Sequence, residues 1–256
     1  ALAVRAVQRL LAGRRIEAAM AEAVSAFAPE FLVYTSRPDE AAHQILMWLP
    51  YLQRTGRRFI IVARTNVAAA AIAEATELPV ITRRRVSDLE AILADSLRVV
   101  FYVNASSGNG AMVRYGQLTH VYLGHGDSDK PPSFNPTHAM YDVIFAAGQA
   151  ATERYGAHGV SIAPEKFRIV GRPQVEDITP PRPGPPQTVL YAPTWRGHVA
   201  ETLLYSLPRG EQIVRALLDR GMRVIFRTHP FSYDFAEDVA VIERIHEILQ
   251  YRYSLH

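Results

Sequence analysis

Three segments of the sequence combine histidine, arginine and glycine in ways that suit a phosphorylated substrate. The first is Gly124-His125-Gly126, which follows the apolar run 121–123. Flanking glycines let a backbone approach a ligand, and a histidine titrates near neutral pH, so His125 could serve as a general base. The alternative is a turn histidine that caps the end of a strand by hydrogen bonding. The sequence leaves both roles open.

Two carboxylates follow at once in Asp127-Ser128-Asp129. This spells the D-x-D pattern of metal-dependent glycosyltransferases, in which carboxylates hold a divalent ion that bridges the donor phosphates. A pattern with two fixed positions arises often by chance. The chain has no cysteine, and none of its histidine pairs has ligand spacing near a carboxylate. We therefore expect neither a metal nor a cofactor.

The second segment is Thr194-Trp195-Arg196, which follows the apolar run 188–192 and a proline turn. It offers an aromatic ring for a base, and a hydroxyl and a cation for phosphate. The alternative is that Trp195 fills the core, which is the commoner use of tryptophan.

The third segment is Arg227-Thr228-His229, at the end of the run 224–227. Alternate residues of an extended chain point to the same side, so Arg227 and His229 would present two donors together. Both could neutralise a pyrophosphate.

Short apolar runs alternate with helical patterns through the first 170 residues, which predicts an α/β fold. Such runs are typical of a parallel sheet with helices on both faces. The turn Gly108-Asn109-Gly110 lacks the rest of a dinucleotide fingerprint and is expected to be a plain loop. The expected strands lie at 31–35, 58–63, 80–82, 99–103, 121–123, 143–146 and 167–170. The expected helices lie at 40–54, 67–76, 86–93, 111–115 and 150–155.

A proline-rich stretch at 180–187 interrupts this alternation and is expected to be a linker. Beyond it, strands are expected at 188–192 and 224–227 and helices at 212–220 and 237–250, with no clear element at 251–256. The pattern predicts two Rossmann-like domains, residues 29–179 and 188–256, with a ligand cleft between them. The second domain is apparently incomplete, because such a domain needs five or six strands.

Residues 1–28 are expected to form a basic amphipathic helix. The apolar side chains fall on one face with arginines around it, so the helix could pack on the first domain or lie on an anionic lipid surface. The net charge of +3 and the pI of about 9.2 fit an anionic ligand or membrane surface, and are too weak to indicate nucleic acid. No run is long enough to span a bilayer, and no signal peptide is apparent. The apolar face comprises Leu2, Val4, Val7, Leu10 and Leu11.

Taken in series, these segments resemble the CDP-glycerol glycerophosphotransferases. Gly124–Lys130 resembles the family motif HGTPLK, and Leu190–Arg196 reads LYAPTWR as in that family. Arg227–Pro230 resembles its R-x-H-P segment, and Gly171-Arg172-Pro173 resembles its G-x-P-R-x-D stretch. The order and spacing agree over roughly residues 95–235. Two departures stand out, because 127–129 replace Thr-Pro-Leu and the family's later serine-rich motif is absent.

The resemblance implies a GT-B fold, with an acceptor-side first domain and a donor-side second domain. It implies that His125 is the catalytic base and that His229 holds the donor pyrophosphate. The remaining donor-side residues would be Thr194, Arg196 and Arg227. The supporting residues on the acceptor side would be Gly124, Gly126, Asp127, Lys130 and Arg172.

The activity implied is that of an EC 2.7.8 type phosphotransferase of teichoic acid synthesis in the cell wall. It would move an alditol phosphate from a CDP-alditol to a hydroxyl of a polyprenyl-linked or polymer acceptor, releasing CMP. The resemblance also implies a cytoplasmic enzyme attached peripherally to the inner, anionic face of the cell membrane. Two alternatives stay open: a GT-B sugar-nucleotide glycosyltransferase or epimerase, and a non-catalytic module that binds a nucleotide diphosphate.

Overall fold

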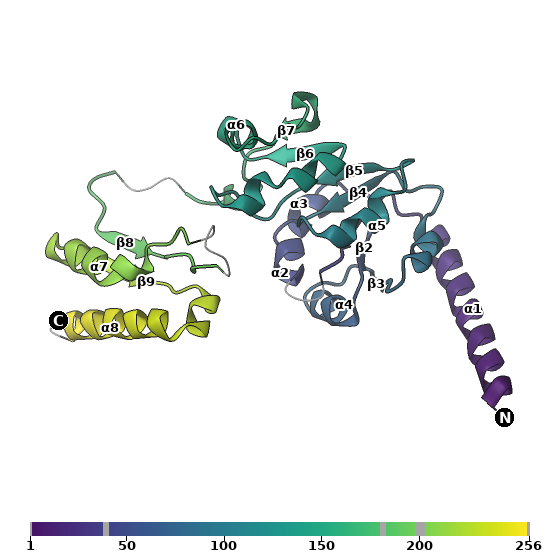
Figure 1. The fold of residues 1–256 in the computed structure, drawn as a ribbon, viewed down its shortest axis with the longest axis horizontal. Helices are drawn as coiled ribbons and strands as arrows, with labels where there is room; N and C mark the ends of the chain where they lie inside the picture. Colours follow the sequence, from purple (N-terminus) through teal and green to yellow (C-terminus); the bar gives the residue numbers. More distant parts are fainter. Residues whose placement is uncertain (1, 38–40, 180–182, 198–202, 255–256) are drawn as a thin grey trace. The chain divides into compact units, whose positions relative to one another are not determined.

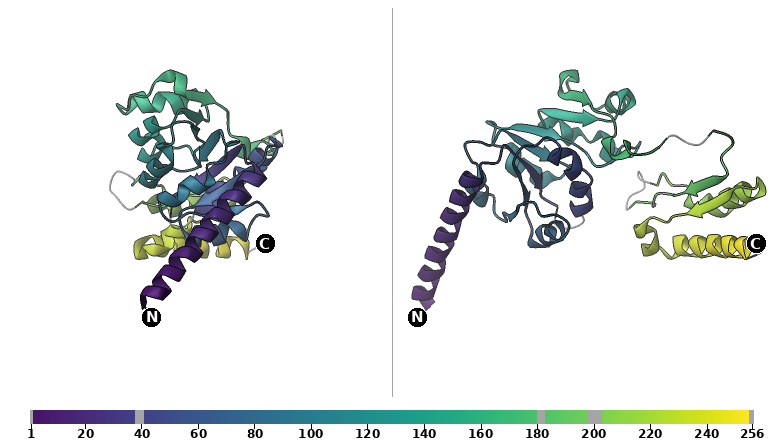
Figure 2. Two further views of the ribbon diagram at one scale, coloured as in Figure 1. Left: turned by 90° about the vertical axis from the view of Figure 1, so that its right-hand side faces the viewer. Right: turned by 180° about the vertical axis from the view of Figure 1, so that it is seen from behind.

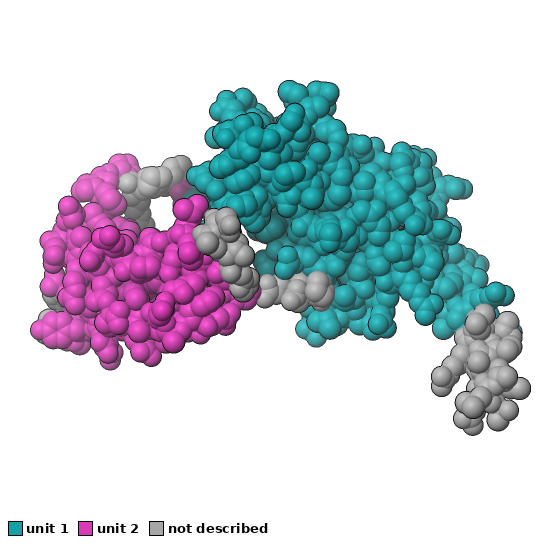
Figure 3. Space-filling model, viewed as in Figure 1, with its two compact units in different colours: residues 1–178 teal, residues 179–256 magenta. Residues whose placement is uncertain are grey.

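The computed structural model describes residues 2–37, 41–179, 183–197 and 203–254, without the side chains of residues 2–12 and 41. The chain divides into two compact units, residues 1–178 and 179–256 (Figure 3). The division falls just before the proline-rich stretch that the sequence marks as a linker, whose residues 180–182 lie outside the described ranges.

The first unit is built on a seven-stranded sheet in the order β3-β2-β1-β4-β5-β6-β7 (Figure 1). Every pairing in it is parallel, which confirms the α/β class and the parallel sheet. The order is Rossmann-like, because it runs outward in opposite directions from β1 and β4. The strands are β1 (Phe31–Thr35), β2 (Phe59–Ala63), β3 (Val80–Thr82), β4 (Val99–Tyr102), β5 (Thr119–Tyr122), β6 (Val143–Ala146) and β7 (Phe167–Ile169).

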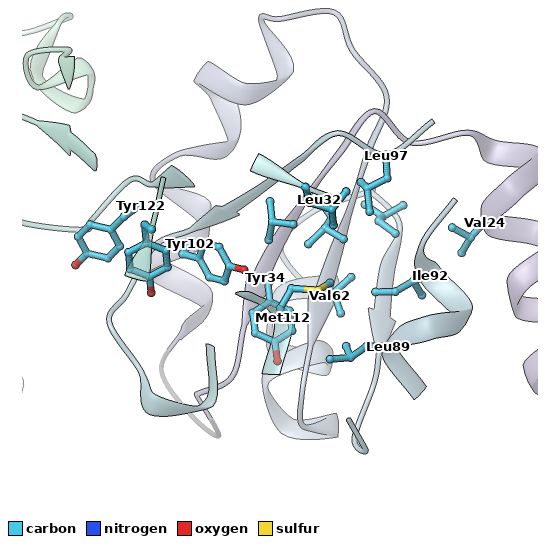
Figure 4. Packing of buried hydrophobic residues seen from close by; sticks show 14 of the residues in the cluster. Val24, Leu32, Tyr34, Val62, Leu89, Ile92, Leu97, Tyr102, Met112 and Tyr122 are labelled. Atoms are coloured by element: carbon cyan, nitrogen blue, oxygen red, sulfur yellow. The ribbon is translucent and has the colours of Figure 1, made fainter. Parts of the chain in front are cut away.

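Both faces of this sheet are covered, as Figures 1 and 2 show. Successive strand residues point to opposite faces, so Leu32 and Tyr34 join one apolar cluster and Phe31 and Val33 the other. The first cluster includes Tyr102 and residues from α1 (Leu2–Phe27), the 3-10 helix η1 (Ser87–Ile92) and α5 (Gly110–Val113) (Figure 4). The second includes residues from α2 (Ala41–Leu46), α3 (Leu49–Gln53) and α4 (Asn66–Ala73).

The sequence predicted one helix over 40–54, and this was wrong. The chain forms α2 and α3 instead, with Trp48 between them and Pro50 in the first turn of α3. A proline has no N–H to donate, and its ring clashes with the carbonyl four residues earlier, which here belongs to Leu46. Helix α2 therefore ends at that residue. The helix expected over 86–93 is the shorter 3-10 helix η1.

Helix α1 packs on the rest of the first unit through its last turns. Val24 is buried at 3% exposure, and Met20 packs against the same cluster beside η1, whereas Ile16 is 64% exposed. The apolar face predicted from Leu2–Leu11 lies outside the described side chains. Its role, on protein or on lipid, stays a prediction. In the part of the chain that the structure describes, no helix is both long enough and apolar enough to cross a membrane.

The second unit contains a parallel pair, β8 (Thr188–Tyr191) and β9 (Arg223–Phe226), with α7 (Gly210–Asp219) and α8 (Ala236–Tyr253). Its core gathers Tyr191, Val224 and the apolar faces of both helices. Helix α8 extends to Tyr253, so the expectation of no element from 251 onward was wrong. The Tyr253 hydroxyl donates to the carbonyl of Val224 at 2.9 Å and accepts from its N–H at 2.7 Å, which ties the last turn to β9.

The turn Gly108-Asn109-Gly110, expected to be a plain loop, forms the 3-10 helix η2 (Ser107–Asn109) and the start of α5 instead, and its two glycines offer a matched test of packing. A Cβ on Gly108 would lie 2.7 Å from Cβ of Ser36, whereas one on Gly110 would meet nothing within 4 Å. We expect Gly108→Ala to lower the free energy of unfolding by about 1–3 kcal/mol, because the loop must shift and strain the 2.7 Å hydrogen bond from Ser36 to Asn109. Gly110→Ala lies in a helix and should be neutral or stabilising. Urea unfolding measures both, and equal losses would contradict the packing argument.

Candidate active site

The carboxyl ends of the strands in the first unit meet at one edge of the sheet, because all the strands are parallel. The chain winds in opposite directions from β1 and from β4, so the topological switch point of the sheet lies between these two strands. Ligands of such sheets bind in the crevice outside the switch point. Ser36 and Arg37 follow β1, Asn104 follows β4 by two residues, and His125 follows β5 by three. His125, the predicted catalytic base, therefore follows the strand that lies next to β4, close to the switch point.

A turn at Gly124 aims His125 toward that switch point. Gly124 adopts a left-handed conformation with φ +69°, and its carbonyl accepts a 2.6 Å hydrogen bond from Nε1 of Trp48. The His125 ring then lies with Nδ1 2.8 Å from the carbonyl oxygen of Val103, directly after β4. Because a carbonyl only accepts, Nδ1 carries the proton and the neutral ring keeps its lone pair on Nε2. The ring thus caps a strand end and also has the tautomer that a base needs.

The surroundings of His125 keep it neutral. Burial lowers the pKa of the imidazole below its ordinary 6.5, and the nearby charges of His43 and Arg37 lower it further, against the opposing effect of the Val103 carbonyl. The residue as a whole is nevertheless exposed at the sheet edge, so the enclosure of its ring is partial. A lowered pKa means that the unprotonated form prevails at neutral pH, which is the form that accepts a proton.

Next to His125 lies a small cavity at the ends of β5 and β6. Its volume is about 60 Å³, room for a few water molecules or a hydroxyl-bearing group. Nucleotide-sized ligands need sites of roughly 300 Å³ or more. The cavity brings together five residues of the sequence prediction, namely Gly124, His125, Gly126, Asp127 and Arg172. Lys130 is partly buried nearby in sequence, and burial lowers the pKa of its ammonium group.

His138 lines the same cavity and was missed by the sequence analysis. It is 1% exposed, its ring packs against Tyr122 with the centroids 4.2 Å apart and the planes tilted by 30°, and its Nδ1 lies 2.7 Å from the Tyr155 hydroxyl. A phenol is a stronger hydrogen-bond donor than a neutral imidazole N–H, so we assign the donor role to Tyr155 and the ring proton of His138 to Nε2. Nε2 is buried with no partner among the described residues. A neutral donor therefore stands beside the base.

His138 carried only a weak signal in the sequence. It lies in the 3-10 helix η4 (Pro136–Met140), which opens with a side-chain cap from Asn135 to the N–H of Thr137 at 2.9 Å. An Asn-Pro step marks an ordered turn. Neither flanking glycines nor an apolar run pointed to the histidine three residues later, and its burial depends on the distant Tyr122 and Tyr155.

The two carboxylates of the D-x-D pattern are held by an arginine. Arg154 of α6 (Gln149–Ala157) donates through Nη1 to Asp127 and through Nε to Asp129 at 2.9 Å. One guanidinium therefore pairs with both carboxylates, which argues against the alternative of a bridging metal. Across the described ranges, no cluster of three or more histidine and acidic residues could hold a metal ion.

In the second unit the two predicted donor-side segments meet at the carboxyl ends of β8 and β9. Tyr191 and Phe226 are in register, and the rings of Trp195 and His229 stack at 5.9 Å beyond them. Nδ1 of His229 accepts from the N–H of Phe231 at 3.2 Å, so the neutral ring carries its proton on Nε2. That N–H is a suitable donor to a phosphate oxygen. Half-buried Thr194 and exposed Arg227 belong to the same two segments.

Arg196 has a different environment from the one predicted. Its guanidinium contacts carboxylate oxygens of Glu237 at 2.9 Å and Asp238 at 3.3 Å, and it lies over the ring of Phe235 at 4.8 Å. Asp238 is 2% exposed, so Arg196 compensates a buried charge in the first turn of α8. The pKa of Arg196 is raised by its hydrogen bonds to Glu237 and Tyr205. That Arg196 binds phosphate stays a prediction, whereas these contacts link it directly to the start of α8.

Comparisons with known proteins found structures of similar arrangement and no family. No protein-family model matches the chain, and no curated protein matches it. Crystal structures of HepE (Alr3699) from Anabaena are similar: with UDP and glucose (13% identity, TM-score 0.46) and with UDP (14%, 0.48). The alignments cover 85% and 87% of this chain and 66% of HepE in each case. At this identity and with TM-scores below 0.5, the likeness identifies neither a family nor a ligand.

Burial of His138 predicts a specific loss of stability in acid. Burial lowers its pKa to about 4 from 6.5, so between these values the unfolded chain binds the proton and the folded chain does not. Stability is therefore retained above pH 6.5 and falls as the pH drops toward 4, by at most about 3 kcal/mol. Urea unfolding at pH 7 and pH 4.5 should show a smaller acid loss in His138→Gln. The exposed His158→Gln should match the wild type, and an unchanged acid loss in His138→Gln would contradict the assignment.

A second comparison separates the roles of two arginines. Arg196→Met leaves Asp238 without its cation and should destabilise the second unit by about 2–4 kcal/mol, below the upper end for fully buried pairs because Arg196 is 23% exposed. Arg227→Met should change stability by less than about 0.5 kcal/mol, because the residue is exposed. Amide hydrogen exchange in α8 measures the difference. Equal protection in both variants would show that Arg196 is dispensable for folding.

Proposed function

We propose that the chain belongs to a transferase that uses a nucleotide diphosphate donor and moves an alditol phosphate to an acceptor hydroxyl. The observation that carries the proposal is the hydrogen bond from Nδ1 of His125 to Val103, because it leaves the lone pair of Nε2 available at the switch-point edge. The adjoining cavity, of about 60 Å³, suits a hydroxyl-bearing group. The resemblance of the motifs supports a CDP-alditol as donor.

The chemistry is a displacement at phosphorus. Nε2 of His125 takes the proton of the acceptor hydroxyl, and the oxygen attacks the phosphorus that bears the alditol. A new P–O bond to the acceptor forms, the bond between that phosphorus and the bridging oxygen breaks, and CMP leaves with that electron pair. The imidazolium then returns its proton to solvent. Nε2–H of His138 would hold an oxygen of the acceptor beside the base.

The donor phosphates are assigned to residues of the second unit. Exposed Arg227 and the ring of His229 are the groups best suited to them, with Thr194, which precedes Trp195 in the other segment, and with Arg196 engaged with α8. Positive side chains stabilise the charge that develops on the leaving group, so no metal is required. An attachment to an anionic membrane surface at the cytoplasmic face, and a polyprenyl-linked or polymer acceptor, complete the proposal.

The direct test is a donor panel with the whole chain. CDP-glycerol and CDP-ribitol should each be tried with a glycerol phosphate oligomer while CMP release is recorded, and UDP-glucose should be tried while UDP release is recorded. CMP release that depends on the acceptor supports the proposal. UDP release instead would favour the sugar-nucleotide alternative, and stabilisation by nucleotides without any turnover would favour the binding module.

The general base gives a further prediction. His125→Ala should lower turnover by about a hundredfold to ten-thousandfold, the usual cost of losing a general base, with donor affinity nearly unchanged. Exposed His158→Ala is the matched control and should retain full turnover. In the wild type, turnover should rise with pH through a midpoint below 6.5, because the pKa of His125 is lowered and only the neutral ring accepts a proton. Near-normal turnover of His125→Ala would place the base elsewhere.

A further inference from the structure

A second pocket lies at the same edge of the first unit's sheet, at the ends of β2 and β3 rather than β5 and β6. It has a volume of about 490 Å³, within the roughly 300–1,000 Å³ of small-molecule sites. Three consecutive arginines that follow β3 line it, together with Asn66 at the start of α4 and Glu17 of α1. None of these residues takes part in the site around His125. The arginines are Arg83, Arg84 and Arg85.

Arg83 is the buried member of this group. Its side chain is 5% exposed, and it contacts Glu17 through Nη1 alone, at 3.2 and 3.3 Å. Nε and Nη2 are buried with no hydrogen-bond partner among the described residues. A buried charged donor without an acceptor is costly. The edge formed by Nε and Nη2 is also the fork with which arginine binds an oxyanion through two parallel hydrogen bonds.

The charge around Arg83 is positive. Arg64, which follows β2, donates from Nη2 to the carbonyl of Arg84 at 2.8 Å and so joins the three arginines. The carboxylates at the pocket are Glu17 and Asp88, and Asp88 already accepts the N–H of Arg85 at 2.9 Å. The pocket and its surroundings thus hold four arginines against two carboxylates, an excess of positive charge. Such a group favours an anion with several oxygens.

We infer that this pocket binds a phosphate group, with Arg84 and Arg85 closing over it from the rim and the side chain of Arg83 turning so that Nε and Nη2, which are enclosed in this structure, donate to two of its oxygens. Glu17, bound at Nη1, is then an anion that competes with the phosphate for the charge of the same guanidinium and repels it. The site is separate from the transfer chemistry proposed for His125. The phosphate could be carried by a soluble metabolite or by a lipid headgroup, and both present the same oxygens.

Inorganic phosphate is the probe for the site itself, and calorimetric titration of the whole chain gives its affinity. Arg83→Met should weaken binding by at least about tenfold, and the double variant Arg84→Gln/Arg85→Gln by several-fold. Glu17→Gln should strengthen binding, because the competing carboxylate is gone. Arg58→Gln is the control, since this exposed arginine precedes β2 at the opposite end of the strand.

The Glu17→Gln variant tests the site even if Arg83→Met fails to fold, because it is expected to raise the affinity for phosphate rather than lower it. An affinity unchanged by Glu17→Gln would overturn the inference. So would an equal loss in Arg58→Gln and in the double variant, since that result would mean a general attraction of anions to a basic protein. The turnover of the double variant with the CDP-alditol donor is not expected to change, which separates this site from the proposed reaction.

Vesicles distinguish the two sources of phosphate. Sedimentation with phosphatidylcholine vesicles, with and without phosphatidylglycerol, should be compared for the wild type and the double variant. Retention that needs phosphatidylglycerol, falls in the double variant and is competed by inorganic phosphate assigns the site to a lipid headgroup. Phosphate binding together with vesicle retention that the double variant leaves unchanged assigns it to a soluble ligand. Absence of both phosphate binding and retention would refute the site.

Discussion

Strand β1 lies between β2 and β4, and its pairing with β4 determines which loops can meet. The two strands run parallel from the pair Phe31 and Val99 to the pair Tyr34 and Tyr102. Each therefore delivers its following loop to the same edge, and the chain winds away from this pair in both directions. The site of His125 and the pocket of Arg83 lie on opposite sides of the switch point for this reason.

At the His125 site the backbone does most of the positioning. The left-handed conformation of Gly124 and the hydrogen bond from Trp48 fix the turn, and the Val103 carbonyl then fixes the tautomer. Trp48 is available there because Pro50 interrupts the helix around it. The same residue that broke the expected long helix thus helps to orient the candidate base. Pro50 therefore accounts both for the break between α2 and α3 and for the position of Trp48 beside Gly124.

The strands were predictable from the sequence because buried parallel strands are continuous apolar runs, and every expected run in the described ranges forms a strand. His125 and His229 were predictable as candidates because each follows such a run. The roles of Arg196, Arg83 and His138 were not, since each depends on a partner far along the chain. Arg196 pairs with Asp238, Arg83 with Glu17, and His138 with Tyr155. A single sequence indicates which side chains can ionise, and burial and partners decide what they do.

The hydroxyl of Tyr253 has a consequence for how the second unit meets other chains. Within the described residues β9 pairs with β8 on one side, and Val224 turns its N–H and carbonyl to the other. An open edge of this kind is a template on which a strand of another molecule can add, the first step of edge-to-edge aggregation. The Tyr253 hydroxyl hydrogen-bonds with both the N–H and the carbonyl of Val224, so a strand of another molecule would have to displace it to pair with β9 there. The end of α8 therefore covers the point of this edge at which both backbone groups of Val224 are engaged.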